Sequence, residues 1–367
     1  MKQNLFSLTA AEQKALLNIR QAIEASADEK TLEKLCETMG QNLGDKKFVY
    51  TYAAVLCAVK NHIELAKHLF FKNVQDPFCS VIHDYLQRTG SFAFGFKVFS
   101  EASPYNGWFE SRFHKQYQPG FVENAASFAE KHPPIHEGDV TTILDIGTGN
   151  GFLIENVLSH ITSLYSLKKL KLVLLDPSTA MLKTAREHCQ KTIHCPLEII
   201  LLEGKMESLE PDQWKQLEEL KPFWFTNISL SLHHMPYTKK VPLFKKLGKL
   251  TEHILFGEVN WSDELANNSP ELVYVTTKAY GLLFKDILTS PAPHKDQQAA
   301  INQFLLPEAI NILKEEIDNR SDYHMTANDW ECLAEETGFH VVKSTLTTKL
   351  EGHPIAFASH WQSNKKT

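Results

Sequence analysis

The stretch Ile143-Leu144-Asp145-Ile146-Gly147-Thr148-Gly149-Asn150-Gly151-Phe152 decides the fold of this 367-residue chain. An apolar run reaches a carboxylate at Asp145, glycine then returns at alternate positions, and an amphipathic run follows from Phe152 to Ile161. This order predicts a buried strand, a tight loop and a helix whose N-terminus faces a ligand. The three glycines allow sharp turns and let a ligand approach the backbone, and the carboxylate can hold the loop or a ligand's ammonium group.

Segments with the composition of strands and helices alternate along this part of the chain, which is typical of a parallel α/β sheet. Right-handed crossovers place helices on both faces of such a sheet and the ligand crevice at the carboxyl ends of its strands. The predicted strands are Thr142–Ile146, Lys171–Asp176, Leu197–Leu202, Phe223–Asn227, a part of Thr251–Gly257, a strand opened by Gly338–Val342, and Pro354–Trp361.

The glycine spacing separates two cofactor designs. The dinucleotide fingerprint needs a third glycine at the position that Phe152 occupies. The pattern G-x-G-x-G behind an acidic residue instead resembles motif I of the class I S-adenosylmethionine-dependent methyltransferases, of the small-molecule, type 12-like kind. The alternatives are a nucleotide-binding turn and a purely structural turn. The resemblance covers residues 138 to 362 and implies a Rossmann-like fold, with a seven-stranded mostly parallel sheet and one antiparallel edge strand.

The resemblance also implies S-adenosyl-L-methionine as the methyl donor and a set of residues that bind it. Asp176 closes the strand after the glycine loop, where the family's acidic residue binds the ribose hydroxyls; it could equally cap the next helix. At Lys205 the family usually has an acid, and a lysine cannot accept from the adenine amino group. That contact would then fall to backbone groups or to Met206. The implied cofactor-binding residues are Asp145, Gly147, Thr148, Gly149, Gly151, Asp176, Pro177, Met181, Lys205, Met206 and Asn227.

Candidate catalytic residues follow the fourth and fifth predicted strands. Methyl transfer is an in-line displacement, so alignment matters most, and a base is needed only for a protonated acceptor. Histidine suits that task because its unperturbed pKa lies near neutrality. The candidates are His233, His234 and His324, with Glu258 as orienter or base. The alternative is a structural role, in which the histidine pair caps a helix and Tyr323 and His324 serve as capping and hinge residues.

Residues 1–90 are predicted to form an N-terminal helical domain. Thr9 and Glu12 have the spacing of a capping box before an amphipathic run, and Phe48–Val59 and Ile63–Phe71 are further predicted helices. The domain could cap the catalytic part, mediate a homodimer or dock a partner. Residues 91–137 form an aromatic-rich connector, whose rings could pack the core or line the acceptor pocket. Its aromatic residues are Phe92, Phe94, Phe96, Phe99, Tyr105, Trp108, Phe109, Phe113, Tyr117 and Phe121.

The predicted methyltransferase domain spans residues 138–367 and contains an insertion at residues 262–322. Leu272–Leu288 and Ala299–Ile317 have helical periodicity there, and we expect them to form a lid that carries substrate specificity. A basic run also precedes the fifth strand, and it is predicted to be a solvated helix face. Its members are Lys239, Lys240, Lys245, Lys246 and Lys249.

Composition excludes several classes of protein. A net charge of −6 argues against a broad nucleic-acid surface. Six scattered cysteines without a C-x-x-C pair predict neither a disulfide framework nor a metal site. No signal peptide and no apolar run of membrane-spanning length is evident, so a soluble cytoplasmic protein is expected. The sequence favours an enzyme that methylates a small molecule; the alternatives are a protein methyltransferase that docks its substrate through the helical domain, and a non-catalytic cofactor-binding protein.

Overall fold

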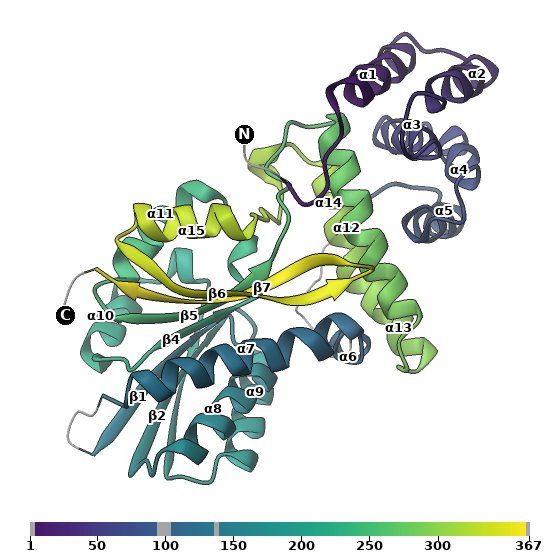
Figure 1. Cartoon of the computed structure of the whole chain (residues 1–367). Coiled ribbons are helices and arrows are strands. Elements are labelled where there is room, and N and C mark those ends of the chain that lie inside the picture. Colours follow the sequence, from purple (N-terminus) through teal and green to yellow (C-terminus); the bar gives the residue numbers. More distant parts are fainter. Residues whose placement is uncertain (1–3, 94–103, 136–138, 365–367) are drawn as a thin grey trace. The chain divides into compact units, whose positions relative to one another are not determined.

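The computed structural model describes residues 4–93, 104–135 and 139–364 (Figure 1). These residues form two compact units. The helical unit comprises residues 4–93, 104–111 and 261–322, and the sheet unit comprises residues 112–135, 139–260 and 323–364. The insertion expected at residues 262–322 therefore lies in the same unit as the N-terminal helices. None of the helices in these residues combines the length and the apolar composition needed to cross a bilayer.

The sheet unit is built around seven strands in the order β3-β2-β1-β4-β5-β7-β6 (Figure 1). The strands β1 to β5 pair in parallel, and β7 runs antiparallel to both β5 and β6. The predicted Rossmann-like, mostly parallel sheet is confirmed, with its antiparallel strand one place in from the edge strand β6. The bounds are β1 (Val140–Ile146), β2 (Lys169–Asp176), β3 (Leu197–Glu203), β4 (Thr226–Ser229), β5 (His253–Val259), β6 (Phe339–Leu350) and β7 (His353–Ser363).

Helices cover both faces of this sheet (Figure 1). One face carries α7 (Arg112–Lys131), α8 (Phe152–Leu164) and α9 (Thr179–Thr192), and the other carries α10 (Pro211–Leu220), α11 (Tyr237–Leu247) and α15 (Ala327–Glu336). On the second face Phe244, Phe256, Trp330 and Trp361 are each fully buried in one continuous apolar core. This core holds the strand ends and their connecting loops in fixed positions.

The fourth strand starts later than predicted. The prediction placed it at Phe223–Asn227, whereas β4 spans Thr226–Ser229. Phe223 forms only an isolated bridge with Thr251, although the N–H of Trp224 already donates to the carbonyl of Thr142 (2.8 Å). Phe223 is buried in the core of the α10 face, while Trp224 packs against Phe128 of α7. Composition alone does not distinguish such burial from strand pairing.

Residues of the helical unit form the predicted helices and several others. The capping box is present, because the hydroxyl of Thr9 accepts from the N–H of Glu12, whose carboxylate accepts in return. The bounds are α1 (Ala10–Glu24), α2 (Glu29–Gly40), α3 (Phe48–Val59), α4 (Ile63–Phe71), α5 (Pro77–Thr89), α6 (Pro104–Phe109), α12 (Pro270–Leu288), α13 (His294–Ala300) and α14 (Leu306–Lys314).

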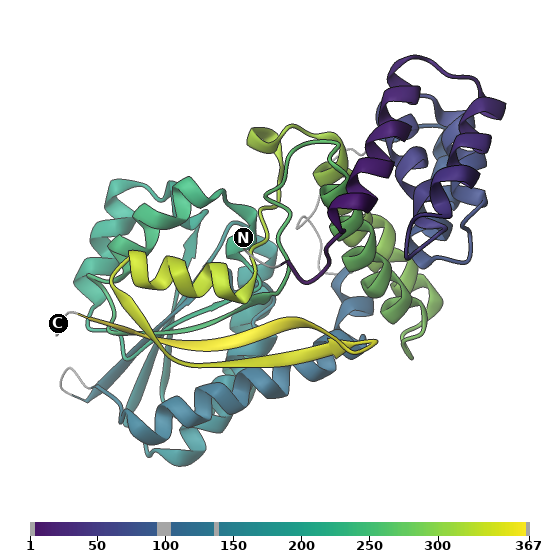
Figure 2. The ribbon, with the colours of Figure 1, turned by 45° about the horizontal axis from the view of Figure 1, so that its top comes forward.

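Figure 2 shows α12 running beside the N-terminal helices. Phe48 of α3 meets Tyr274 edge to face, with ring centroids 4.8 Å apart, and Phe78 of α5 stacks on Phe284 at 5.9 Å. The apolar faces of α3 and α5 are therefore covered by a segment from the insertion. The helix predicted at Ala299–Ile317 is wrong in its extent, because a π-helical turn interrupts it at Ile301–Leu305 and it ends at Lys314.

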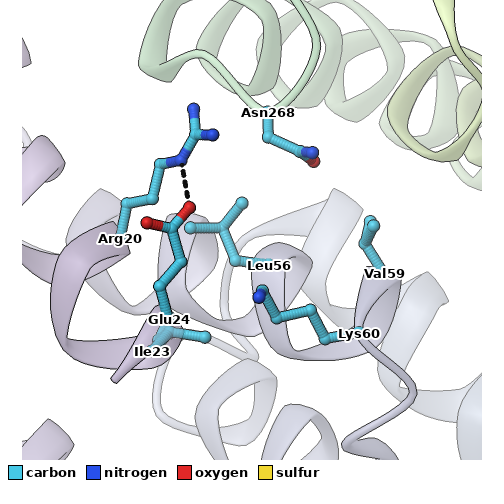
Figure 3. A pocket seen from close by; sticks show the side chains of 7 residues that line it. All are labelled: Arg20, Ile23, Glu24, Leu56, Val59, Lys60 and Asn268. Atoms are coloured by element: carbon cyan, nitrogen blue, oxygen red, sulfur yellow. Dashed lines mark hydrogen bonds and ion pairs between the residues drawn. The ribbon is translucent and has the colours of Figure 1, made fainter. Parts of the chain in front are cut away.

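The aromatic connector is divided between the units. Tyr105 belongs to the helical unit and Tyr117 to the sheet unit. The rings of Phe94, Phe96 and Phe99 lie outside the described residues. The helical unit also contains a small pocket, shown in Figure 3, next to the ion pair between Arg20 Nε and the Glu24 carboxylate (2.8 Å). That pair is exposed, so it stabilises the unit little. The pocket is lined by Arg20, Ile23, Glu24, Leu56, Val59, Lys60 and Asn268.

Candidate functional site

The glycine loop joins β1 to α8 and has left-handed backbone at all three glycines. The φ angles are +69° at Gly147, +55° at Gly149 and +79° at Gly151. A Cβ at Gly147 would lie 2.2 Å from the Cβ of Ser231, and one at Gly151 would lie 2.7 Å from Ala185. At Gly149 a Cβ would meet no atom within 4 Å. Packing thus requires two of the glycines, whereas the third borders open space where a ligand can approach the backbone.

Asp176 closes β2 and holds the glycine loop from the side. Its carboxylate accepts from the N–H of Gly149 (2.9 Å) and from the N–H of Ser178 (2.8 Å). Burial raises the pKa of this carboxyl, and the two backbone hydrogen bonds act against that rise. Each carboxylate oxygen has capacity for a second hydrogen bond. Asp176 therefore holds the loop and has capacity left for a ligand's hydroxyl groups, whereas the alternative helix-cap role falls to Ser178, whose side chain accepts from the N–H of Met181.

Asp145 and Asn227 meet at the carboxyl ends of β1 and β4. The Nδ2 of Asn227 donates to the Asp145 carboxylate at 2.6 Å, and both side chains are buried. Burial raises the pKa of Asp145 to about 6, although hydrogen bonds from Asn227 and Thr148 oppose the shift. Among the described residues the Oδ1 of Asn227 has no hydrogen-bond partner. A buried acceptor without a donor is costly, and a cationic ligand group would supply the missing donor.

The remaining predicted cofactor residues differ in exposure. Thr148 donates its N–H to the carbonyl of Leu175 (3.1 Å). Pro177 is exposed, Met181 is buried in α9, and Lys205 is exposed after β3. Met206 is 3% exposed and packs into the core of the α10 face. The structure brings Asp145, Asn227, Asp176 and the glycines together, while the adenine contacts at Lys205 and Met206 stay predictions.

Glu258 lies near the end of β5. Its carboxylate is fully buried, and both of its oxygens have hydrogen-bond partners. One oxygen accepts from the backbone N–H groups of Ser231 (2.9 Å), Leu232 (2.9 Å) and His233 (3.3 Å). The other lies 2.8 Å from His233 Nδ1. Burial acts to raise the pKa of Glu258, but attraction to His233, His324 and Lys240 outweighs it and holds the pKa at about 2. Glu258 is therefore an orienter of the loop after β4, and it is too acidic to serve as a base near neutral pH.

The three candidate histidines are close together. The rings of His233 and His324 stack with their centroids 4.8 Å apart. The ring centroids of His233 and His234 are 4.1 Å apart. The N–H of Tyr323 donates to the carbonyl of His233 at 2.6 Å, which attaches the segment before α15 to the loop after β4. Thr326, and not Tyr323 or His324, caps α15. The structure thus assembles residues that are far apart in the sequence at the carboxyl end of the sheet.

Lys240 corrects the prediction of a solvated basic face. Its side chain is fully buried, its Nζ donates to the carbonyl of Tyr323 (2.7 Å), and it lies 4.6 Å from the centre of the Trp330 ring. The ammonium group therefore supports the segment that carries His324. Helical spacing could have indicated this, because Lys240 lies on the same face of α11 as the buried Leu243, Phe244 and Leu247.

Three residues with hydroxyl groups at the site were not predicted as site residues. Ser231 packs against Gly147, and its Oγ donates to the carbonyl of Ile146 (3.3 Å). The phenol of Tyr117, which the sequence analysis named only among the aromatic residues of the connector, lies 2.7 Å from the hydroxyl of Ser229. Tyr117 is buried, and this burial raises its pKa well above the ordinary value. Neither serine belongs to a motif, so nothing local in the sequence marks them.

Comparison with known proteins gives matches in structure alone. No family model matches the chain, and no curated protein sequence matches it. The structure of SCL7 from Oryza sativa has 13% sequence identity and a TM-score of 0.59, over 96% of this chain and 100% of that one. A SAM-dependent methyltransferase from Leishmania major has 17% identity and a TM-score of 0.38, over 67% of this chain and 72% of that one. An O-methyltransferase family 2 protein from Planctomyces limnophilus, in complex with apigenin, has 13% identity and a TM-score of 0.41, over 78% and 69%.

At these identities the likeness concerns the fold, and the match to SCL7 extends over nearly the whole chain. The chain therefore has a Rossmann-like fold with a seven-stranded, mostly parallel sheet.

Proposed function

We propose that this protein is an S-adenosyl-L-methionine-dependent methyltransferase that acts on a small-molecule acceptor. The observation that carries the proposal is the open space beside Gly149, with the Asp176 carboxylate bonded to the same residue. In parallel α/β sheets such a loop, at the carboxyl ends of the strands, is where cofactors bind.

The residues at the site match the ribose, the ammonium group and the carboxylate of this cofactor. Asp176 would accept from the two ribose hydroxyls, and Asp145 with the unpaired Oδ1 of Asn227 would accept from the ammonium of the methionine part. The N-terminus of α8 adds the favourable end of a helix dipole for the carboxylate. When bound, the cofactor supplies an electrophilic methyl group on a sulfonium.

His233 is the residue we assign as the base. Its Nδ1 lies 2.8 Å from the ionised Glu258, so the ring is held with a proton on Nδ1. The proton of an acceptor hydroxyl or carbon acid would then go to Nε2. The stacked ring of His324 restricts the rotation of His233, and Lys240 supports the backbone that carries His324. The site's contribution is thus alignment together with one proton transfer.

A binding experiment tests the cofactor proposal. We expect calorimetry with S-adenosylhomocysteine to show binding that Asp176→Ala weakens by about 1–3 kcal/mol, because charge-assisted hydrogen bonds are lost. Gly149→Val should abolish binding. Gly352→Val is the matched control, because Gly352 also has positive φ (+86°) and open space but lies in the β6–β7 turn. The assignment would be refuted if the protein bound NAD but not S-adenosylhomocysteine. It would also be refuted if both valine variants lost S-adenosylhomocysteine affinity equally.

A second experiment tests the base. Acceptors are screened by release of S-adenosylhomocysteine, and His233→Ala is then compared with His234→Ala and His324→Ala in turnover, melting temperature and cofactor affinity. Loss of a general base lowers the chemical step by about 10²–10⁴-fold. We expect that loss at His233 with cofactor affinity retained. Equal turnover in all three variants would exclude a histidine base and indicate an acceptor, such as a thiolate or free amine, that needs none.

A further inference from the structure

A second group of histidines lies at the amino end of β5, away from the glycine loop. His132 directly follows α7, His253 opens β5, and His360 lies in β7. In the antiparallel pair of strands His253 is opposite Gln362, and Leu255 is opposite His360. His253 and His360 are therefore diagonal neighbours on one face of the sheet, the face that α7 covers. We call His132, His253 and His360 the histidine cluster.

The three imidazoles converge closely enough to share one ion. One ring nitrogen from each lies within 4.8 Å of the other two, and His253 Nδ1 is 3.1 Å from His360 Nε2. A tetrahedral zinc ion, with Zn–N bonds of about 2.0–2.1 Å, sets its nitrogen ligands about 3.3 Å apart. The rings are mutually tilted, with interplanar angles of 47° to 72°. Side-chain rotation would bring the more widely spaced nitrogens to that separation.

The surroundings of the cluster keep its rings neutral. Burial lowers the pKa of His253 to about 4 and that of His360 to about 3, and repulsion among the histidines acts in the same direction. Burial also lowers the pKa of His132. A neutral imidazole carries the lone pair that a metal needs, so binding would displace no proton from these rings at neutral pH.

Packing explains only part of this arrangement. The ring of Phe128 lies 5.0 to 5.2 Å from all three imidazoles, so the cluster also forms an aromatic core. Aromatic packing alone does not require ring nitrogens to face one another, because apolar rings would fill the same space without polar atoms to satisfy. The facing nitrogens of His253 and His360 share a hydrogen bond at 3.1 Å, which a metal ion would replace by two coordinate bonds.

We propose that the histidine cluster binds one divalent transition-metal ion of the zinc type through three imidazole nitrogens. His253 and His360 are buried and His132 is only half-buried, so the ion would enter from the side of His132 and keep one position for water. Glu252, whose carboxylate is 3.9 Å from His253 Nε2, adds negative charge nearby. The ion would join the end of α7 to β5 and β7. Cysteine spacing gave no hint of such a site, because its ligands come from three distant segments.

The test uses the untagged full-length protein and zinc chloride. Competition with a chromophoric chelator should give one zinc ion per chain, and cobalt(II) should give the intense visible absorption of a tetrahedral site. His132→Gln is the principal variant because this half-buried residue is the least needed for folding, and we expect it to weaken zinc binding more than about tenfold. His360→Gln should act likewise, with circular dichroism confirming that both variants are folded.

Two control variants locate the site. His340→Gln changes an exposed histidine of β6, and His324→Gln changes the stacked pair at the carboxyl end of the sheet. Both should leave zinc binding unchanged. Zinc should also raise the melting temperature of the wild type and of both controls, but not that of His132→Gln. Absence of zinc binding by the wild type, or binding that survives both His132→Gln and His360→Gln, would overturn the proposal.

Discussion

The two ends of β5 carry histidines in opposite electrostatic settings. At the carboxyl end, His233 pairs with the ionised carboxylate of Glu258 at 2.8 Å. At the amino end, His253 faces His360 at 3.1 Å and the apolar ring of Phe128. The first setting gives the ring a carboxylate as its hydrogen-bond partner, whereas burial at the second lowers the pKa of His253 to about 4. The same side chain is thus prepared for proton transfer at one end of a strand and for neutral packing or metal ligation at the other.

This difference shows that the group facing each buried histidine, and not the extent of its burial, decides what the imidazole can do. His233, His253 and His360 are all less than 9% exposed. What separates them is one carboxylate, which itself is held by three backbone N–H groups of the loop after β4. Removing or neutralising that carboxylate should therefore make the carboxyl end resemble the amino end, at a large cost in stability.

The largest effect is expected for Glu258→Ala. Three backbone N–H groups and His233 would lose their common acceptor in a buried site, which we expect to lower the free energy of unfolding by about 3–5 kcal/mol. Urea denaturation followed by tryptophan fluorescence measures this. Glu252→Ala is the control, because that partly exposed carboxylate precedes the same strand and should cost less than about 1 kcal/mol. A loss below about 1 kcal/mol at Glu258 would contradict the assigned role.

Asp145 is a buried carboxylate at this end of the sheet with a raised pKa, and its substitution should stabilise the protein. Its pKa in the folded state is about 6, mainly because of burial, against an ordinary value of 3.8. A raised pKa means that stability is lost as pH rises from about 4 through 6. Asp145→Asn should therefore gain about 2–3 kcal/mol at pH 8 and nothing near pH 4, while weakening cofactor binding. Equal unfolding free energies at pH 8 would count against this.

The acid dependence of Glu258 should have the opposite sign. Attraction to His233 outweighs burial and holds its pKa at about 2, below the ordinary value of 4.5. The stability that its ionised form adds is fully present above pH 4.5 and is lost as pH falls toward 2. Between pH 6 and pH 3 the wild type should lose about 2 kcal/mol more than Glu258→Gln does. Parallel stability curves for the two proteins would show that the carboxylate is not specially stabilised.

The smallest effect is expected at the amino end, in the absence of metal. Phe128→Leu removes the ring that contacts all three imidazoles and should lower the free energy of unfolding by about 1–2 kcal/mol. Phe71→Leu serves as the matched control, because Phe71 is 60% exposed and its change should stay within about 0.5 kcal/mol. If Phe128→Leu lowers the free energy of unfolding as much as Glu258→Ala does, the contributions of packing and charge at the two ends of β5 are not distinguishable.

Local patterns predicted much of the fold. The strand closed by Asp176 and the helix Phe48–Val59 are both found, because each consists of a continuous apolar run with clear ends. The start of β4 was missed because Phe223, Trp224 and Phe225 are buried by packing before pairing begins. Alternation and apolar runs report burial, and they report hydrogen-bonded pairing only indirectly.

The candidate site divides in the same way. Gly149 and Asp176 were predictable because a loop and the adjacent strand end are joined by backbone hydrogen bonds within one motif. The buried position of Lys240 depends on the carbonyl of Tyr323, which arrives from a distant segment. The histidine cluster likewise needs the β5–β7 register, and no local spacing encodes it. Contacts made by the tertiary fold are therefore the part that the sequence left undetermined.

The discontinuous helical unit has a consequence for synthesis and truncation. Helices α3 and α5 bury their apolar faces against α12, which leaves the ribosome only after β1 to β5 have been made. Until α12 has been made, these apolar faces stay exposed to solvent or bound to a chaperone. Contacts between segments so distant along the chain also form slowly. Cutting the chain near residue 90 would consequently not release an independent domain. It would leave two pieces of one core, each with an apolar surface prone to aggregate.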